Sequence, residues 1–232
     1  MKQLTVIQHT SADYLGLIED HLEGRQIRFH YHRPFTEAGK VPQFAQVGDG
    51  LILLGGGPWG SAGVRDVPTL AEEVALARAC YMSGVPMIGI GLGAQIVSLA
   101  CDGSVEEAPL TLTAEEAVRV ADDALAGFMP ERWLNPVYMR DRPVPPPFAQ
   151  TLAIDPEGRP AAFQVGTNIF GFTGHPGFKR AMAEDLIMEF EEVPEKPGAA
   201  LDALGMRKND IADALVPMMT GIVQLTGWMD AG

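Results

Sequence analysis

The chain has 232 residues, which suits one large α/β domain, or two small ones, with a substantial core. Its 30 acidic side chains against 17 basic ones give a net charge of −13, and no run concentrates lysine or arginine. This balance argues against binding to nucleic-acid phosphates or to an anionic membrane, because both surfaces carry negative charge. No segment reaches the roughly 18 apolar residues that a membrane span needs.

The two cysteines, Cys80 and Cys101, have no metal-ligand spacing and are expected to be free thiols in a reducing compartment. The apolar stretch near the N-terminus is too short for a signal peptide, so we expect a cytoplasmic protein. His30 and His32 share one face of a strand, where two imidazoles suit a metal, but no carboxylate or cysteine lies near them in sequence. We therefore predict neither a metal nor a cofactor.

In the first half of the chain, apolar runs alternate with amphipathic stretches. The runs at 51–54 and 85–90 are apolar without interruption, which is typical of strands buried on both faces. Strands that alternate with helices predict a parallel sheet with right-handed crossovers. The expected elements are strands at 4–8, 25–31, 51–54 and 85–90, and helices at 12–23, 69–83 and 92–99.

The second half changes character. Residues 141–147 hold too many prolines for a helix or a central strand. A hairpin (161–164 and 168–173) and a helix (178–190) follow, and then a polar linker. We expect a domain at 1–192, with a linker and an amphipathic helix at 193–232 that packs on the domain or on a partner. Pro217 should kink or begin that helix.

Three glycine-marked sites fall just beyond expected strands, where open parallel sheets place their binding sites. Gly55, Gly56 and Gly57 form either a tight turn or a loop that presents N–H groups to an anion. Residues 89–95, Gly-Ile-Gly-Leu-Gly-Ala-Gln, run from a strand into a helix as a nucleophile elbow does. A dinucleotide fingerprint would need a third glycine and an acidic partner that are absent. His175, before a proline, is either a general base or part of a surface turn.

In this order and at these separations, the sites resemble the class I glutamine amidotransferases, over residues 4–190. In that family the elbow reads Gly-Ile-Cys-Leu-Gly-His-Gln and the base motif reads His-Pro-Glu. A tryptophan-containing strand and a proline-bearing loop of the short stand-alone members resemble residues 133–148. The resemblance implies a flavodoxin-like α/β fold, with an open, mostly parallel sheet and helices on both faces.

The resemblance fails at the catalytic residues. Gly91 takes the position of the cysteine nucleophile, Ala94 that of the elbow histidine, and Gly177 that of the glutamate. Glutamine hydrolysis through a thioester needs a thiolate, a base and a group that orients the base. Only His175 remains, as a vestigial base. Cys101 lies about 15 Å along the following helix and Cys80 precedes the strand, so neither replaces the missing thiol.

We therefore expect an amidotransferase-like protein that has lost glutaminase activity and acts as a binding or regulatory subunit. Its expected partners are a small molecule in the vestigial pocket, and a second copy or a synthetase-like protein. One alternative is an enzyme of the same fold that uses His175 in other chemistry. Another is a nucleotide or phosphate site in the Gly-rich loops, although basic residues are missing near them. The expected ligand-binding residues are Gly55, Gly56, Gly57, Leu92 and Gln95.

Overall fold

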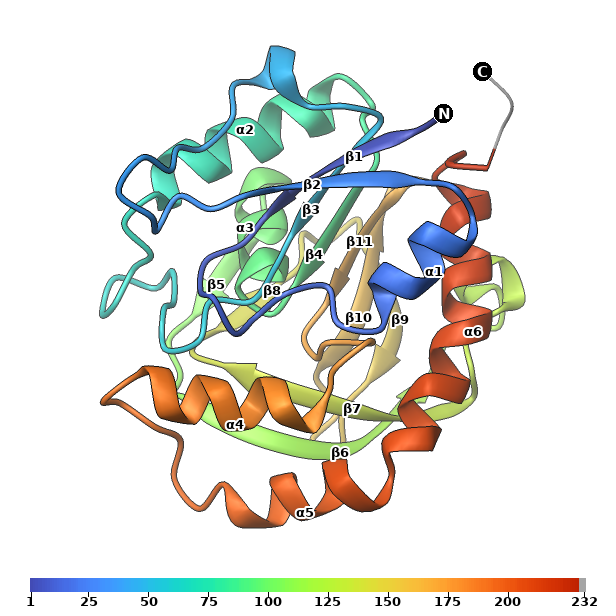
Figure 1. The fold of residues 1–232 in the computed structure, drawn as a ribbon. Coiled ribbons are helices and arrows are strands. Elements are labelled where there is room, and N and C mark those ends of the chain that lie inside the picture. Colours follow the sequence, from blue (N-terminus) through green and yellow to red (C-terminus); the bar gives the residue numbers. More distant parts are fainter. Residues whose placement is uncertain (230–232) are drawn as a thin grey trace.

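The computed structural model describes residues 1–229, and a nine-stranded mixed sheet runs through this part of the chain (Figure 1). One half of the sheet is parallel, which confirms the predicted α/β class. The prediction that the runs at 51–54 and 85–90 form neighbouring parallel strands is also confirmed. The parallel strands are, in spatial order, β2 (Arg28–His32), β1 (Gln3–Ile7), β3 (Gly50–Leu53), β4 (Met87–Ile90) and β11 (Ile169–Phe172).

The other half of the sheet is antiparallel. The expected hairpin is present as β10 and β11, and the sheet continues from β10 through β9 to a long ribbon of β6 and β7. Sequence patterning did not predict β6, because its polar residues break any apolar run. Prolines confine residues 142–144 to a separate two-stranded sheet of β5 and β8. These strands are β10 (Pro160–Val165), β9 (Gln150–Ile154), β6 (Thr111–Arg119), β7 (Arg132–Met139), β5 (Ser104–Glu106) and β8 (Arg142–Val144).

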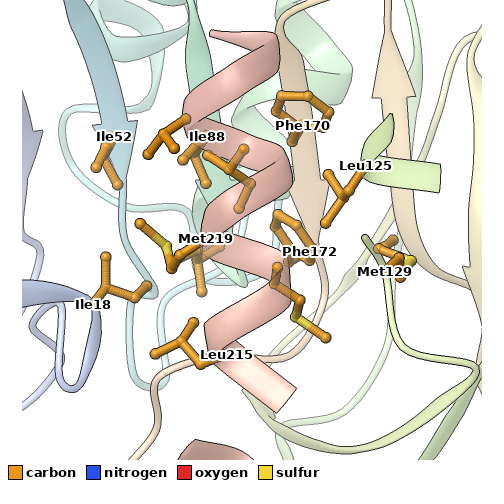
Figure 2. Packing of buried hydrophobic residues seen from close by; sticks show 14 of the residues in the cluster. Ile18, Ile52, Ile88, Leu125, Met129, Phe170, Phe172, Leu215 and Met219 are labelled. Atoms are coloured by element: carbon orange, nitrogen blue, oxygen red, sulfur yellow. The ribbon is translucent and has the colours of Figure 1, made fainter. Parts of the chain in front are cut away.

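Helices cover both faces of the parallel strands. On one face α1 (Ile18–Gly24) and α6 (Lys208–Leu225) bury one set of strand residues; Figure 2 shows Leu215 and Met219 of α6 in this layer. On the other face α2 (Leu70–Met82) and α3 (Leu92–Ala100) bury the alternate set. Successive strand side chains point to opposite faces, so both sets of an apolar strand are covered.

Two further helices cover the ribbon of β6 and β7. α4 (Arg180–Glu189) and α5 (Gly198–Met206) pack Met182 and Leu204 against Leu112, Leu134 and Tyr138, which lie on one face of the ribbon. Short 3-10 turns occur at η1 (Phe44–Gln46) and at η2 (Ala124–Gly127), which packs on α6. Among residues 1–229, no helix has both the length and the apolar character that crossing a membrane requires.

Two expectations about helices need correction. The helix predicted at 12–23 begins only at Ile18, because Gly16 adopts a φ of 61° and the chain before it forms a loop. The tail predicted as a linker followed by one helix contains two helices, α5 and α6. Pro217 lies inside α6 and not at its start. The last three residues of the predicted tail lie outside the described residues.

Candidate functional site

The three glycine-marked sites meet at one edge of the sheet. They follow the carboxyl ends of β3, β4 and β11, which are neighbours in the sheet. A Cβ atom built on Gly91 would lie 3.4 Å from the Cα of Gly55 and 3.9 Å from the carbonyl oxygen of Tyr138. The Gly91 N–H donates a hydrogen bond of 2.9 Å to the carbonyl oxygen of Phe172, the last residue of β11. The elbow therefore lies between the Gly-rich loop, β7 and the strand that leads to His175.

Gly91 keeps the backbone geometry of an elbow without carrying a side chain. It directly follows β4 and caps α3, with φ 56° and ψ −115°. Residues with a Cβ rarely adopt such angles, which cost on the order of 1–3 kcal/mol. The space around Gly91 would accept a Cβ at ordinary contact distances, so backbone conformation is the main reason for glycine here.

Both nitrogens of the His175 ring are occupied by backbone groups. Nε2–H donates to the carbonyl oxygen of Tyr14 at 2.7 Å, and Nδ1 accepts from the N–H of Gly177 at 3.1 Å. The residue is only 4 % exposed. Burial lowers its pKa to about 4, although the hydrogen bond to Tyr14 favours the protonated ring. The imidazole is therefore neutral at pH 7, and neither nitrogen is free to take a proton from a nucleophile.

The position next to His175 that would orient a base has no room for a side chain. A Cβ on Gly177 would lie 2.9 Å from the backbone nitrogen of Ile18 and 3.1 Å from the carbonyl oxygen of Leu15. The carbonyl oxygen of Gly177 also accepts a hydrogen bond of 2.9 Å from the N–H of Leu17. The loop before α1 therefore fills the space that a glutamate would need.

Gln95, an expected ligand-binding residue, is used inside the protein. It is fully buried, and its Oε1 accepts a hydrogen bond of 2.5 Å from the Ser61 hydroxyl. Its Nε2 donates to the carbonyl oxygen of Arg140 at 2.6 Å. Leu92 is also buried, and its side chain lies against Gly56. A ligand would have to break these hydrogen bonds to reach the Gln95 amide.

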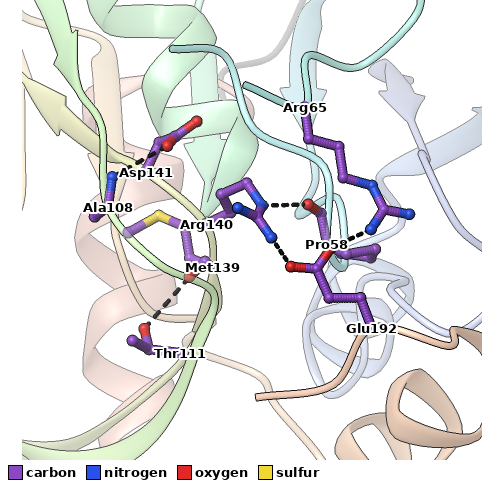
Figure 3. A network of polar contacts seen from close by, with 8 residues as sticks. All are labelled: Pro58, Arg65, Ala108, Thr111, Met139, Arg140, Asp141 and Glu192. Atoms are coloured by element: carbon purple, nitrogen blue, oxygen red, sulfur yellow. Dashed lines mark hydrogen bonds and ion pairs between the residues drawn. The ribbon is translucent and has the colours of Figure 1, made fainter. Parts of the chain in front are cut away.

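A polar network that the sequence did not predict holds the loop beyond the three glycines (Figure 3). Arg140 donates from Nε to the carbonyl oxygen of Pro58 at 2.9 Å, and both Arg140 and Arg65 pair with the Glu192 carboxylate. Asp141 accepts hydrogen bonds from the backbone N–H groups of Ser61 and Ala62 at 2.9 and 3.1 Å. No motif marks these residues, because only the fold brings the segments together.

His9 and Glu73 form a second unpredicted feature, behind the glycine loop. Nδ1–H of His9 donates to the carbonyl oxygen of Gly55 at 3.1 Å, and Nε2 lies 2.7 Å from Oε2 of Glu73. Both side chains are buried. Burial opposes the protonation of His9, but the Glu73 carboxylate and the two hydrogen bonds outweigh it and raise the pKa. The sequence held one signal: His9 follows the carboxyl end of β1, at the edge where such sheets place their sites.

Asp13 lies against Gly55, in the same buried region. Burial raises the pKa of its carboxyl to about 7; the nearby His9 opposes this shift and Glu189 adds to it. Its Oδ1 and the hydroxyl of Tyr138 are enclosed and have no hydrogen-bond partner among residues 1–229. The glycine loop therefore rests on a cluster of buried ionisable groups.

The loop still offers backbone donors. Among residues 1–229, the N–H of Gly56 has no hydrogen-bond partner. Leu92 begins α3, a position where the N–H has no partner inside the helix. Groups of this kind suit a carboxylate or a developing oxyanion.

Other candidate groups lie apart from this site. Cys80 and Cys101 are buried, and burial raises the pKa of each thiol to about 12, so both are protonated. The rings of His30 and His32 meet edge to face, with centroids 5.0 Å apart. Within residues 1–229 there is no group of three or more His, Cys, Asp or Glu side chains that could hold a metal ion.

Comparison with known proteins identifies the fold. No protein-family model and no curated protein sequence matches the chain. A glutamine amidotransferase structure from Methylobacillus flagellatus superposes with a TM-score of 0.81 at 20% identity, over 97% of this chain and 95% of that one. Another, from Thermotoga maritima, gives 0.79 at 19% identity, over 97% of this chain and 98% of that one. The chain therefore has the glutamine amidotransferase fold, as the order of its motifs predicted.

Proposed function

We propose that this amidotransferase-like protein does not hydrolyse glutamine and acts as a binding or regulatory protein. One observation carries the proposal: a hydrogen atom stands at Gly91, where the fold would place a nucleophile, and both nitrogens of His175 are bonded to backbone groups. Without a thiolate no thioester can form. A nucleophile, its base and the orienting group act as a unit, so the loss of two of them removes the chemistry.

The arrangement of side chains also disfavours the two alternative functions. An enzyme that used His175 as a base would need one free ring nitrogen and a pKa near neutrality, whereas burial lowers this pKa to about 4. A phosphate site in the glycine loop would need free cations. The two arginines beside that loop, Arg65 and Arg140, are both paired with Glu192.

We infer that a ligand of the vestigial pocket would be a small molecule with a carboxylate or carbonyl oxygen. The N–H groups of Gly56 and Leu92 suit such an oxygen, and a ligand must break the hydrogen bond between Gln95 and the Arg140 carbonyl oxygen to use the Gln95 amide. A second copy of the chain or a synthetase-like protein is the proposed protein partner. The proposed location is the cytoplasm.

Ammonia release from glutamine tests the proposal. The wild-type protein should not exceed a buffer control, and the matched set is Gly91→Cys, Gly91→Cys with Gly177→Glu, and His175→Ala. We expect Gly91→Cys to stay inactive, because its thiol would have no free imidazole beside it. Saturable ammonia release by the wild type that is lost in His175→Ala would contradict the proposal.

Gly91→Cys should also lower the free energy of unfolding by about 1 kcal/mol, because a Cβ must adopt the elbow conformation. Urea unfolding measures this cost and shows that the variant is folded during the assay. An ordinary enzymatic rate from this single variant would show that the site is still organised for catalysis.

A further inference from the structure

A cavity of about 270 Å³ lies on the second face of the β6–β7 ribbon, away from the elbow. On the first face α4 and α5 cover Leu112, Leu134 and Tyr138. On the second face the register pairs Thr111 with Met139, Thr113 with Val137, and Glu115 with Asn135, and all six residues line the cavity. Figure 3 shows Thr111 beside Met139, whose carbonyl oxygen accepts a hydrogen bond of 3.3 Å from the Thr111 hydroxyl. The volume is near the lower end of the roughly 300–1,000 Å³ that small-molecule sites occupy.

The walls of the cavity are stiff and apolar at several points. Pro143 and Pro145 come from the segment around β8, Pro156 comes from the turn between β9 and β10, and Pro160 is the first residue of β10. Proline has a fixed φ, so these walls have little freedom to collapse into the cavity. The cavity is therefore formed before any ligand enters.

The charge of the cavity favours a cation. Six acidic side chains and two arginines line it. Both arginines, Arg142 and Arg159, form ion pairs with Glu157. Glu106 and Glu115, in contrast, are exposed at the cavity and their side chains make no hydrogen bond or ion pair among residues 1–229, so their carboxylates are available to a ligand.

Asn135 gives a second, independent indication of a ligand. It is only 5 % exposed and lines the cavity, yet its amide makes no hydrogen bond with residues 1–229. Its amide atoms are not among the fully enclosed unpartnered atoms of residues 1–229, so the amide keeps accessible surface that a ligand in the cavity can reach. Asn135 stands opposite Glu115 in the ribbon, and cross-strand partners have neighbouring side chains.

We propose that this cavity binds a small organic amine in its protonated form. An ammonium group carries three donors and no acceptor. It would donate to the Glu115 carboxylate and to Oδ1 of Asn135, two acceptors that the fold leaves unused. The carbon skeleton of the ligand would lie on Val137, Met139 and the prolines. Carboxylate ligands are disfavoured, because free acidic side chains would repel them.

This inference does not rest on the state of the elbow. The cavity-lining face of the ribbon is opposite to the face that carries Tyr138, and no residue of the glycine loop or of the elbow lines the cavity. Glutamine hydrolysis by the protein would therefore not contradict the amine site. Failure of the amine site would likewise not contradict the proposed loss of glutaminase activity.

Isothermal titration calorimetry tests the proposal with 2-phenylethylamine and spermidine as cationic probes. The neutral probe 2-phenylethanol and the anionic probe 3-phenylpropionate serve as matched controls. We expect saturable binding of at least one amine, and weaker or no binding of both controls. Glu115→Gln, which keeps shape but removes charge, should weaken amine binding about tenfold, as the loss of a charge-assisted hydrogen bond implies. Asn135→Ala should weaken it to a similar extent.

Glu107→Gln and Glu131→Gln are the control variants, because both carboxylates are exposed outside the cavity; they should bind the amine as the wild type does. Thermal unfolding verifies that every variant is folded. The proposal is wrong if neither amine binds at millimolar concentration. It is equally wrong if binding is unchanged in both Glu115→Gln and Asn135→Ala, or if 2-phenylethanol binds as tightly as the amine.

Discussion

The elbow and the outer face of the β6–β7 ribbon differ in what the chain does with its polar side chains. At the elbow, the side chains of His175, Gln95 and Arg140 all form hydrogen bonds with other groups of the protein. On the ribbon, Glu115 and Asn135 face a cavity without such partners. Resemblance in sequence pointed to the first region, where the unpartnered Asp13 Oδ1 and Tyr138 hydroxyl are enclosed. The unpartnered side chains that line a cavity point to the second region. A position that matches a family motif therefore does not by itself locate a functional site.

Breaking the buried pair behind the glycine loop should have the largest effect on stability. Glu73→Ala would leave His9 buried without its carboxylate, and removing one partner of such a pair costs about 3–5 kcal/mol. The pKa of His9 is raised in the folded protein, so its stabilising effect is present at low pH and is lost as pH rises through that pKa.

Urea unfolding at several pH values measures this effect. The cost of Glu73→Ala should be highest at low pH and decline as pH rises. The exposed neighbour Glu72, changed to alanine, provides the control. Equal stabilities for the two variants would show that the buried pair does not hold the loop.

The buried carboxyl of Asp13, beside the elbow, should make the stability of the protein depend on pH. The variant Asp13→Asn, whose side chain is neutral, tests this. The folded pKa of about 7 is above the ordinary value of 3.8, so the native state binds this proton more tightly than the unfolded chain does. The wild type should therefore lose stability as pH rises from 3.8 to about 7, and then level off. Asp13→Asn should be similar to the wild type at low pH and more stable at pH 8, by on the order of 4 kcal/mol. A constant difference across this range would contradict the prediction.

The smallest effect is expected from a single added methyl group beside His175. Gly177→Ala places a Cβ against backbone atoms of Ile18 and Leu15, and overpacking of this kind costs about 1–3 kcal/mol. Gly198→Ala is the matched control, because no atom lies within 4 Å of the added Cβ there. Urea unfolding compares the two. If Gly177→Ala were as stable as the control, the space beside His175 would be open, and a glutamate would fit there.

Local sequence pattern was sufficient for the parallel half of the fold. The buried runs at 51–54 and 85–90, each closed by glycine, predicted β3, β4 and their adjacency, because an uninterrupted apolar strand is stable only between two covering layers. The same pattern located the elbow at Gly91. It overextended the first helix, because the φ of Gly16 depends on the contact between its loop and Gly177.

Only the tertiary structure decided the rest. The polar strand β6 has no signal of its own, because it is stabilised by pairing with β7 and by α4 and α5, whereas the family resemblance had marked the tryptophan-containing strand that forms β7. The glycine at position 91 was readable in the sequence. The sequence did not reveal which backbone groups bond the two ring nitrogens of His175. Nor did it reveal that the Asn135 amide, in a residue only 5 % exposed, makes no hydrogen bond among residues 1–229. A hydrogen bond depends on which atoms the folded chain brings within about 3 Å, and residues far apart in sequence meet only when the sheet has assembled.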